Sequence, residues 1–220
     1  MVEDLIALAD TVRANHPDLP LVLFGHSMGS FLAQRSMQVA GDRFAGVVLS
    51  GTSGGLEGGE ELRPILEAIE EAEGPDAPSE LFAGMFAGFN AAFEATVDEP
   101  TGFEWLSRDP VEVARYVADP WCGGPLSNGF VTDMITAMGE LWTPEAEAGI
   151  PPGLPILLIA GDADPVGDEG ASVRALGDRY EAAGLGPIST ILYPGARHEV
   201  LNETNRDEVH DDLRRWLADV

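Results

Sequence analysis

Short apolar runs alternate with amphipathic segments at both ends of the chain, but not in its middle. Apolar positions recur every three to four residues over 2–15, which predicts a helix. Continuous apolar runs at 20–24 and 46–50 predict buried strands, and residues 30–39 between them have helical spacing. Because apolar strands joined through a helix are typical of parallel pairing, we expect a parallel sheet with helices on its faces.

The middle of the chain, from about 53 to 150, has no apolar run of strand type and a high share of the aromatic residues. Phe82, Phe86, Phe89 and Phe93 recur at helical spacing. We interpret these phenylalanines as the core of a helical segment, with contact to an acyl chain as the alternative.

The alternation of strands and helices returns in the last third of the chain. The expected elements are strands at 155–160 and 188–193 and helices near 169–183 and 206–218. We therefore predict one α/β core over 1–52 and 151–220, with a mostly parallel sheet of about four strands and helices on both faces. Residues 53–150 are predicted to form a helical cap inserted into this core.

Composition narrows the function classes. The 12 basic residues, all arginines, face 38 acidic ones, for a net charge of −26. A surface this acidic repels phosphate backbones, so we expect no nucleic-acid partner. No apolar run reaches the length of a membrane span, and we expect no stable membrane insertion. Cys122 is the single cysteine and cannot form an internal disulfide, and the cytoplasm is the simplest compartment.

A candidate nucleophile lies where the first strand gives way to a helix. Gly25, His26, Ser27, Met28 and Gly29 form a G-x-S-x-G sequence. A nucleophile on a sharp strand-to-helix turn has a strained backbone, and flanking glycines relieve collisions between the two arms of the turn. The turn also aims the Met28 amide at a developing oxyanion. The alternative is a glycine-rich turn with an exposed serine.

A serine nucleophile needs a base, and this type of turn predicts the order serine, acid, histidine. Of the four histidines, His16 ends a helix, His26 precedes the serine, and His210 lies in the acidic last helix. His198 follows the last predicted strand, at the sheet end where α/β proteins place their ligands. We select His198 as the base; the four histidines lack metal-ligand spacing, and we expect neither a metal nor a cofactor.

The acid should come from the loop after the preceding strand, where three aspartates compete. Asp164 is preferred because it can turn back over the sheet edge, with Pro165 stiffening the turn behind it. Asp162 is the alternative, or it binds the backbone amides of the loop. Asp168 is interpreted as the cap of the helix that follows.

Three segments together resemble the α/β-hydrolase superfamily, namely Leu21–Gly29, Gly161–Val166 and Tyr193–Glu199. They are similar in particular to bacterial monoacylglycerol lipases and lysophospholipase-like hydrolases, which are described as serine aminopeptidase-like. The resemblance covers essentially the whole chain, including Phe103–Asp109 and Tyr116–Cys122 in the insertion and Leu201–Arg206 after the histidine.

By position, the resemblance implies that Ser27 is the nucleophile, Asp164 the acid, His198 the base and Met28 one oxyanion donor. It also implies that the insertion is a cap that shapes the acyl pocket.

The N-terminal part departs from this resemblance. In the superfamily the nucleophile follows several strands, and the second oxyanion amide comes from an earlier loop. Only 26 residues precede Ser27, and each further strand and helix needs roughly 20–25 residues. We expect a truncated chain whose apolar strand at 20–24 forms an exposed edge, which favours a homodimer through that strand.

Three functions follow. The first is hydrolysis of carboxylic esters, of the monoacylglycerol or lysophospholipid-like type, through an acyl-enzyme. The second is a catalytically impaired fold that serves binding or assembly, and the third is amide or peptide hydrolysis on the same fold. For the enzyme, the partner is a small ester substrate, and the acidity of the chain disfavours anionic lipid surfaces.

Overall fold

The sheet of this protein has four strands, all parallel, in the order β1-β2-β3-β4. The structure is a computed structural model that describes residues 1–56 and 58–220, apart from the side chain of residue 60. The strands are β1 (Val22–His26), β2 (Gly46–Ser50), β3 (Ile156–Gly161) and β4 (Ile188–Tyr193). The expected parallel sheet of about four strands is confirmed.

The first strand runs further than its apolar residues suggest. We expected it to stop before Gly25, but pairing with β2 continues through Gly25 opposite Leu49 and His26 opposite Ser50. Backbone pairing, which does not depend on an apolar side chain, therefore carries the strand up to the candidate nucleophile.

Nine α-helices lie in the described part of the chain. They are α1 (Val2–Asn15), α2 (Met28–Ala40), α3 (Gly59–Glu73), α4 (Glu80–Ala91), α5 (Pro110–Ala118), α6 (Asn128–Gly139), α7 (Pro144–Glu147), α8 (Ala171–Ala182) and α9 (Arg206–Ala218). The first and last agree with the predicted ranges. Helix α2 begins two residues earlier than expected, directly after the candidate nucleophile. None of these helices is long and apolar enough to cross a membrane.

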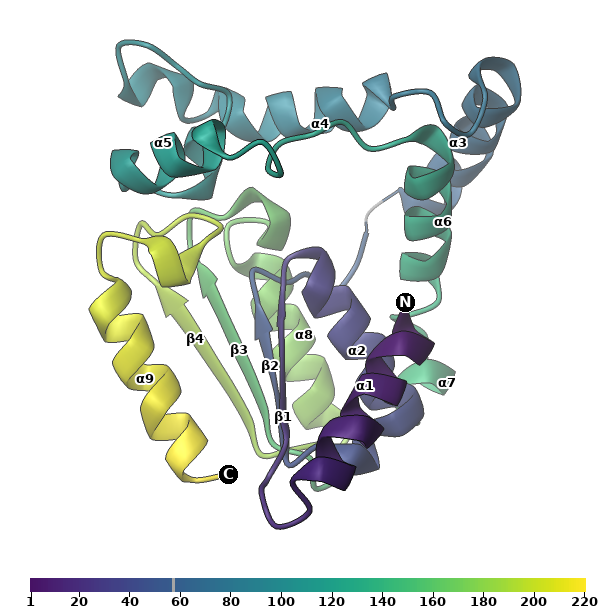
Figure 1. The fold of residues 1–220 in the computed structure, drawn as a ribbon, viewed down its shortest axis with the longest axis vertical. Coiled ribbons are helices and arrows are strands. Elements are labelled where there is room, and N and C mark those ends of the chain that lie inside the picture. The colour runs from purple at the N-terminus through teal and green to yellow at the C-terminus, as the bar shows by residue number, and fades with distance from the viewer. Residues whose placement is uncertain (57) are drawn as a thin grey trace.

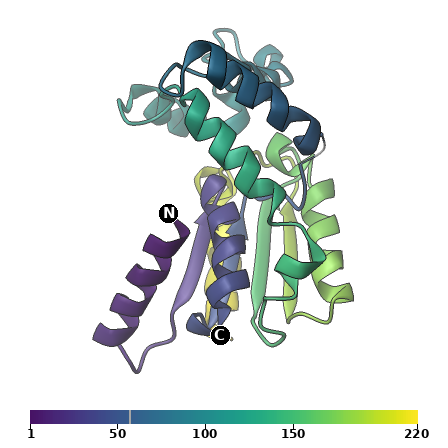
Figure 2. The same ribbon diagram turned by 90° about the vertical axis from the view of Figure 1, so that its right-hand side faces the viewer.

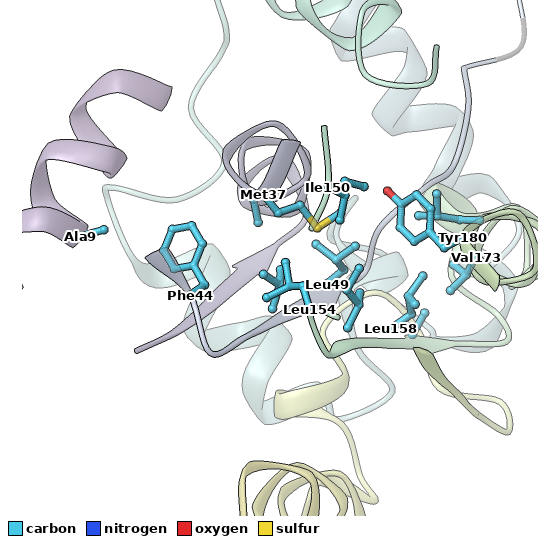
Figure 3. Packing of buried hydrophobic residues seen from close by; sticks show 14 residues of the cluster. Ala9, Met37, Phe44, Leu49, Ile150, Leu154, Leu158, Val173 and Tyr180 are labelled. Carbon is cyan, nitrogen blue, oxygen red and sulfur yellow. The ribbon is translucent and has the colours of Figure 1, made fainter. Parts of the chain in front are cut away.

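Alternate residues of the strands pack into two hydrophobic cores, one on each face of the sheet. Leu49 and Leu158 face α2 and α8, where Met37 and Tyr180 cover them (Figure 3). Helix α1 adds only Ala9, at the margin of this cluster. On the opposite face Val48, Leu157 and Ile159 pack against α9. The result is a three-layer arrangement, and Figure 2 shows α1, α2 and α8 along one face.

Helices α3 to α6 lie beyond the carboxyl ends of the strands, above the sheet in Figure 1. We call them, with their connecting segments, the cap. They have a hydrophobic cluster of their own, built around Leu66, Phe82, Val131 and Ile135. Between 53 and 150 the described residues form no strand, only an isolated bridge. The division of the chain into a core and a cap insertion is an interpretation of this arrangement.

The phenylalanine stripe of the cap is only partly helical. Phe82 is buried, and Phe86 and Phe89 are half-buried on α4, but Phe93 lies beyond the end of that helix. Phe93 packs under the guanidinium of Arg197, 4.3 Å from the ring centroid. The expectation that all four rings share one helix is wrong for Phe93.

Strand β1 lies at one edge of the sheet. Its Phe24 side chain is 38% exposed. Association of two copies through this strand stays a prediction, because the structure contains one chain.

Candidate active site

Ser27 occupies a strained turn between β1 and α2. Its φ of 53° and ψ of −123° lie where residues other than glycine are rare. The Ser27 amide donates to the Ser50 carbonyl at 2.9 Å, and the Ser27 carbonyl accepts the Ser30 hydroxyl at 2.6 Å. The neighbouring strand and the first turn of α2 thus hold the strain in place, as a nucleophile elbow requires.

The two glycines of the motif have different roles. A Cβ on Gly25 would meet the backbone of Gly29 and lie 2.8 Å from Ala33 Cβ, so strand and helix approach too closely for a side chain there. A Cβ on Gly29 would meet nothing within 4 Å. The expectation that both glycines relieve the collision is therefore correct only for Gly25. Gly29 contributes its backbone to the close approach, and its own side-chain position is open.

Asp164 and His198 form a buried pair. His198 Nδ1 lies 3.0 and 2.9 Å from the two carboxylate oxygens of Asp164. The Asp164 side chain is inaccessible, and that of His198 is 2% exposed. The Val166 amide also donates to Asp164 Oδ1 at 2.9 Å and fixes the carboxylate. With Nδ1–H donated to Asp164, the other ring nitrogen of His198 is left to accept a proton.

The other two aspartates of the loop do different work. Asp162 Oδ1 accepts the amide of Gly195 at 2.6 Å, which is the backbone-binding role considered for it. Asp168 has a φ of 51° and is followed by Glu169 and Gly170, which also have positive φ. The N-cap of α8 is Gly170, without a side-chain hydrogen bond, so the interpretation of Asp168 as the cap is wrong.

His26 lies beside the base. Its ring centroid is 4.7 Å from that of His198, and its Nδ1 is 3.3 Å from the Ser50 hydroxyl. Burial and the proximity of His198 lower the pKa of His26 to about 4, against the opposing effect of Asp164. His26 is therefore neutral near pH 7 and adds no charge that would compete with protonation of His198.

Two residues that lie beside His198 were not among the site residues predicted from the sequence motifs. Gly51 follows β2 with a φ of 56°, and a Cβ there would lie 3.0 Å from two atoms of the His198 ring. Trp105, from the cap, packs on the other side with its ring centroid 4.8 Å from that of His198. A glycine after an apolar strand is a weak hint of close approach, but the tryptophan can be placed only in three dimensions.

Ser27 lies at the same end of the sheet as the pair of Asp164 and His198. His26 precedes Ser27 in the chain and lies against His198, so the elbow and the buried pair are at the same end of the sheet. No hydrogen bond joins the Ser27 hydroxyl to His198 in the described part of the chain. Met28 is the first residue of α2, and its amide is among those without an acceptor inside the helix.

The remaining histidines lie elsewhere. His16 ends α1 ahead of β1, at the amino ends of the strands, and His210 is on α9. Among residues 1–56 and 58–220, no group of three or more acidic, histidine or cysteine side chains could hold a metal ion.

Comparison with known proteins gives the family. Residues 1–205 match the family described as Serine aminopeptidase, S33. A monoacylglycerol lipase of Mycolicibacterium smegmatis is 30% identical, over 99% of this chain and 69% of the lipase. A monoglyceride lipase of Mus musculus is 27% identical, over 99% of this chain and 64% of the lipase. The chain thus spans about two thirds of these relatives.

Superposition on solved structures supports the same family. A thermostable carboxyl esterase from Bacillus coagulans, solved in complex with glycerol, superposes with a TM-score of 0.88 at 29% identity, over 100% of this chain and 71% of the esterase. A lipase in its open form superposes with a TM-score of 0.84 at 31% identity, over 99% of this chain and 70% of the lipase. This chain therefore belongs to the serine aminopeptidase S33 family of α/β-hydrolases and is monoacylglycerol lipase-like, as the sequence motifs imply.

Proposed function

We propose that the protein is a serine hydrolase that cleaves carboxylic esters of the monoacylglycerol or lysophospholipid-like type. The observation that carries the proposal is the buried hydrogen bond between His198 and Asp164, beside the strained turn that bears Ser27. A carboxylate that binds one imidazole nitrogen fixes the tautomer, so that the other nitrogen can act as a base.

In the proposed reaction the Ser27 hydroxyl attacks the ester carbonyl, and His198 takes the proton from that hydroxyl. Asp164 stabilises the resulting imidazolium. The Met28 amide binds the oxyanion of the tetrahedral intermediate. The intermediate expels the alcohol, which receives the proton from His198, and leaves an acyl group on Ser27. A water molecule then hydrolyses this acyl-enzyme with the same base.

The substrate class rests on the relatives and on the charge of the chain. The curated relatives are monoacylglycerol and monoglyceride lipases, and one structural relative is a carboxyl esterase bound to glycerol. The net charge of −26 favours neutral or zwitterionic esters over anionic ones.

The test is turnover of a p-nitrophenyl acyl ester by wild type, Ser27→Ala and a control, Ser189→Ala. We expect Ser27→Ala to abolish turnover and labelling by a fluorophosphonate probe, because a serine activated by a base is the group that reacts. Ser189 lies near the amino end of β4, whereas Asp164 and His198 follow the carboxyl ends of strands, so the control removes a serine outside the candidate site. Equal turnover by wild type and Ser27→Ala would rule out Ser27 as the nucleophile. Absence of both turnover and labelling in wild type would favour a binding or assembly role.

Amide hydrolysis is the second candidate, because the matched family is described as a serine aminopeptidase. Aminoacyl p-nitroanilides, assayed beside the esters with the same variants, compare the two bonds. A higher kcat/KM on the anilides than on the esters would replace the ester proposal with this one.

A further inference from the structure

We infer that the cap segment Glu104–Asp109, held by the buried carboxylate of Glu203, positions His198 against Asp164. The inference rests on the proposed function, in which His198 is the base. The segment belongs to the cap and follows α4, whereas His198 and Glu203 belong to the loops between β4 and α9. Because the Glu203 side chain is fully buried, it acts on catalysis through the histidine and not through the substrate.

The first connection is through the backbone. The His198 amide donates to the Trp105 carbonyl at 3.3 Å, and the Glu199 amide donates to the Leu106 carbonyl at 2.8 Å. These two hydrogen bonds fix the His198 loop from the cap side. On the core side the same loop is held by the Ala163 amide, which donates to the Ala196 carbonyl at 3.0 Å.

Glu203 joins the two sides. Its side chain is fully buried, and its Oε1 accepts the amides of Arg108 at 3.0 Å and Arg197 at 2.9 Å. Its Oε2 accepts Arg108 Nε at 2.8 Å and the Thr204 amide at 2.9 Å. One carboxylate therefore fixes the backbone of the cap segment and the residue directly before His198. Although burial opposes it, these hydrogen bonds lower the pKa of Glu203, so the group stays charged.

Arg197 adds hydrogen bonds from the His198 loop to the cap segment. Its guanidinium donates to the Glu104 carbonyl at 2.6 Å and to the Ser107 carbonyl at 3.2 Å. The same guanidinium lies over the ring of Phe93 in the cap. A residue next to the base thus binds two carbonyl groups of the cap segment that the base contacts.

The cap segment is itself anchored, which it must be to position another loop. Asn90 on α4 donates to Glu104 Oε2 at 2.8 Å, and the Thr101 amide and hydroxyl donate to Glu104 Oε1 at 2.6 and 2.7 Å. Burial alone would raise the pKa of Glu104, but these hydrogen bonds lower it to about 2. The Trp105 amide donates to Asn90 Oδ1 at 3.1 Å, so α4 carries the segment.

The experiment compares Glu203→Gln with a matched control, Glu181→Gln, on the exposed surface of α8. Both remove one negative charge and keep the size of the side chain. At position 203 the change places an NH₂ group where an oxygen accepts two donors, so donor meets donor. The readouts are kcat and KM on the ester substrate, and the proton NMR signal of His198 Nδ1–H, which the hydrogen bond to Asp164 shifts far downfield. Loss of that signal in Asp164→Asn assigns it.

For Glu203→Gln we expect kcat to fall about ten- to hundred-fold with KM unchanged, because a small displacement of a catalytic group has this effect. The downfield signal should broaden or disappear, while Glu181→Gln should match wild type in both readouts. A folded Glu203→Gln protein with the wild-type signal and kcat would overturn the inference.

A second variant decides the matter if Glu203→Gln does not fold. The Arg108 side chain is 31% exposed. Arg108→Met removes only its guanidinium and leaves the hydrogen bond from the backbone amide of residue 108 to Glu203. We expect a broadened downfield signal and a kcat lowered about three- to ten-fold. Arg108→Lys should restore part of both, because an ammonium can still bind Glu203. An unchanged signal in Arg108→Met would overturn the inference. The NMR signal needs no turnover, so it tests the positioning even if the ester proposal fails.

Discussion

The indole of Trp105 lies against the imidazole of His198, with ring centroids 4.8 Å apart and ring planes inclined by 35°. The same indole stacks on Phe86 of α4, with centroids 5.4 Å apart. A row of aromatic rings thus runs from the cap to the proposed base. The cap therefore does more than cover the carboxyl ends of the strands, because its Trp105 packs directly on the proposed base.

Substitution of Trp105 tests this packing. Trp105 is 5% exposed, and its ring nitrogen is buried without a hydrogen-bond partner in the described part of the chain. Trp105→Ala should lower the free energy of unfolding by about 3–5 kcal/mol, since it leaves a large cavity. Trp105→Phe keeps an aromatic wall and removes the unsatisfied N–H group, so the loss should be below about 1.5 kcal/mol. Urea denaturation measures both, and equal losses would contradict the packing argument.

The two glycines of the elbow should respond differently to alanine. Gly25→Ala forces a methyl group into the backbone of the following helix and should destabilise the protein by about 1–3 kcal/mol. Gly29→Ala adds a methyl group in open space inside α2 and should be neutral or stabilising by up to about 1 kcal/mol. Thermal unfolding of the two variants beside wild type measures the difference. A larger loss for Gly29→Ala would show that the elbow is not arranged as described.

Stability should fall in weak acid because of His26. Its pKa is about 4 in the folded protein against 6.5 for an ordinary histidine, so the unfolded chain binds more protons between these values. The free energy of unfolding should therefore decrease as the pH falls from about 6.5 to about 4, by roughly 3 kcal/mol from this group.

The His26 contribution is isolated by substitution. His26→Gln should flatten the stability profile in this pH window, whereas His16→Gln, at an exposed position, should leave it unchanged. The measurement is urea unfolding at a series of pH values. A His26→Gln profile as steep as that of wild type would assign the loss to other groups.

Gln34 links the elbow helix to the cap and to α8. Its Nε2 donates to Thr52 Oγ1 at 2.9 Å, and its Oε1 accepts Trp142 Nε1 at 3.0 Å and the Tyr180 hydroxyl at 3.4 Å. Gln34→Leu should lower the free energy of unfolding by about 1–3 kcal/mol for each buried donor, Trp142 Nε1 and the Tyr180 hydroxyl, that loses its acceptor. Gln38→Leu removes the bond to the Leu141 carbonyl and the bond accepted from Arg35 Nη1, but no aromatic donor loses its acceptor, so the loss of stability should be smaller in the same urea titration. The reverse order would contradict the assigned network.

Hydrolysis should depend on the charge of the lipid surface. With a net charge of −26, the protein should be slower on a monoacylglycerol in anionic vesicles than in neutral micelles at low salt. The difference should shrink at about 1 M salt, where the Debye length is about 3 Å. Initial rates in the four conditions test this, and faster hydrolysis on anionic vesicles at low salt would refute it.

The sequence predicted much of the core because periodicity and turn residues are local properties. The apolar runs at 46–50 and 188–193 became strands with these bounds, and the last helix covers 206–218 as expected. The pairing of Asp164 with His198 could also be anticipated, since carboxyl ends of neighbouring parallel strands meet at one sheet edge. The roles of Ser27 and Met28 stay predictions, because they depend on the reaction that we propose.

The predictions that were wrong concern local conformations that depend on backbone dihedral angles or on strand pairing. Strand β1 continues through Gly25 and His26 because β2 pairs with them. Asp168 does not cap α8, because it begins a run of three residues with positive φ that ends at Gly170, and Gly170 is the N-cap. Composition contains no signal for either result.

The sequence by itself determined most of the strands and helices, the elbow motif and the loops that carry the candidate acid and base, because each is recognised from residues close in the chain. Only the tertiary structure decided that Trp105 packs on His198 and that Glu203 ties the cap segment to the His198 loop. The physical reason is distance along the chain. Contacts between residues some ninety positions apart, such as Arg108 with Glu203, form only when the layers pack together.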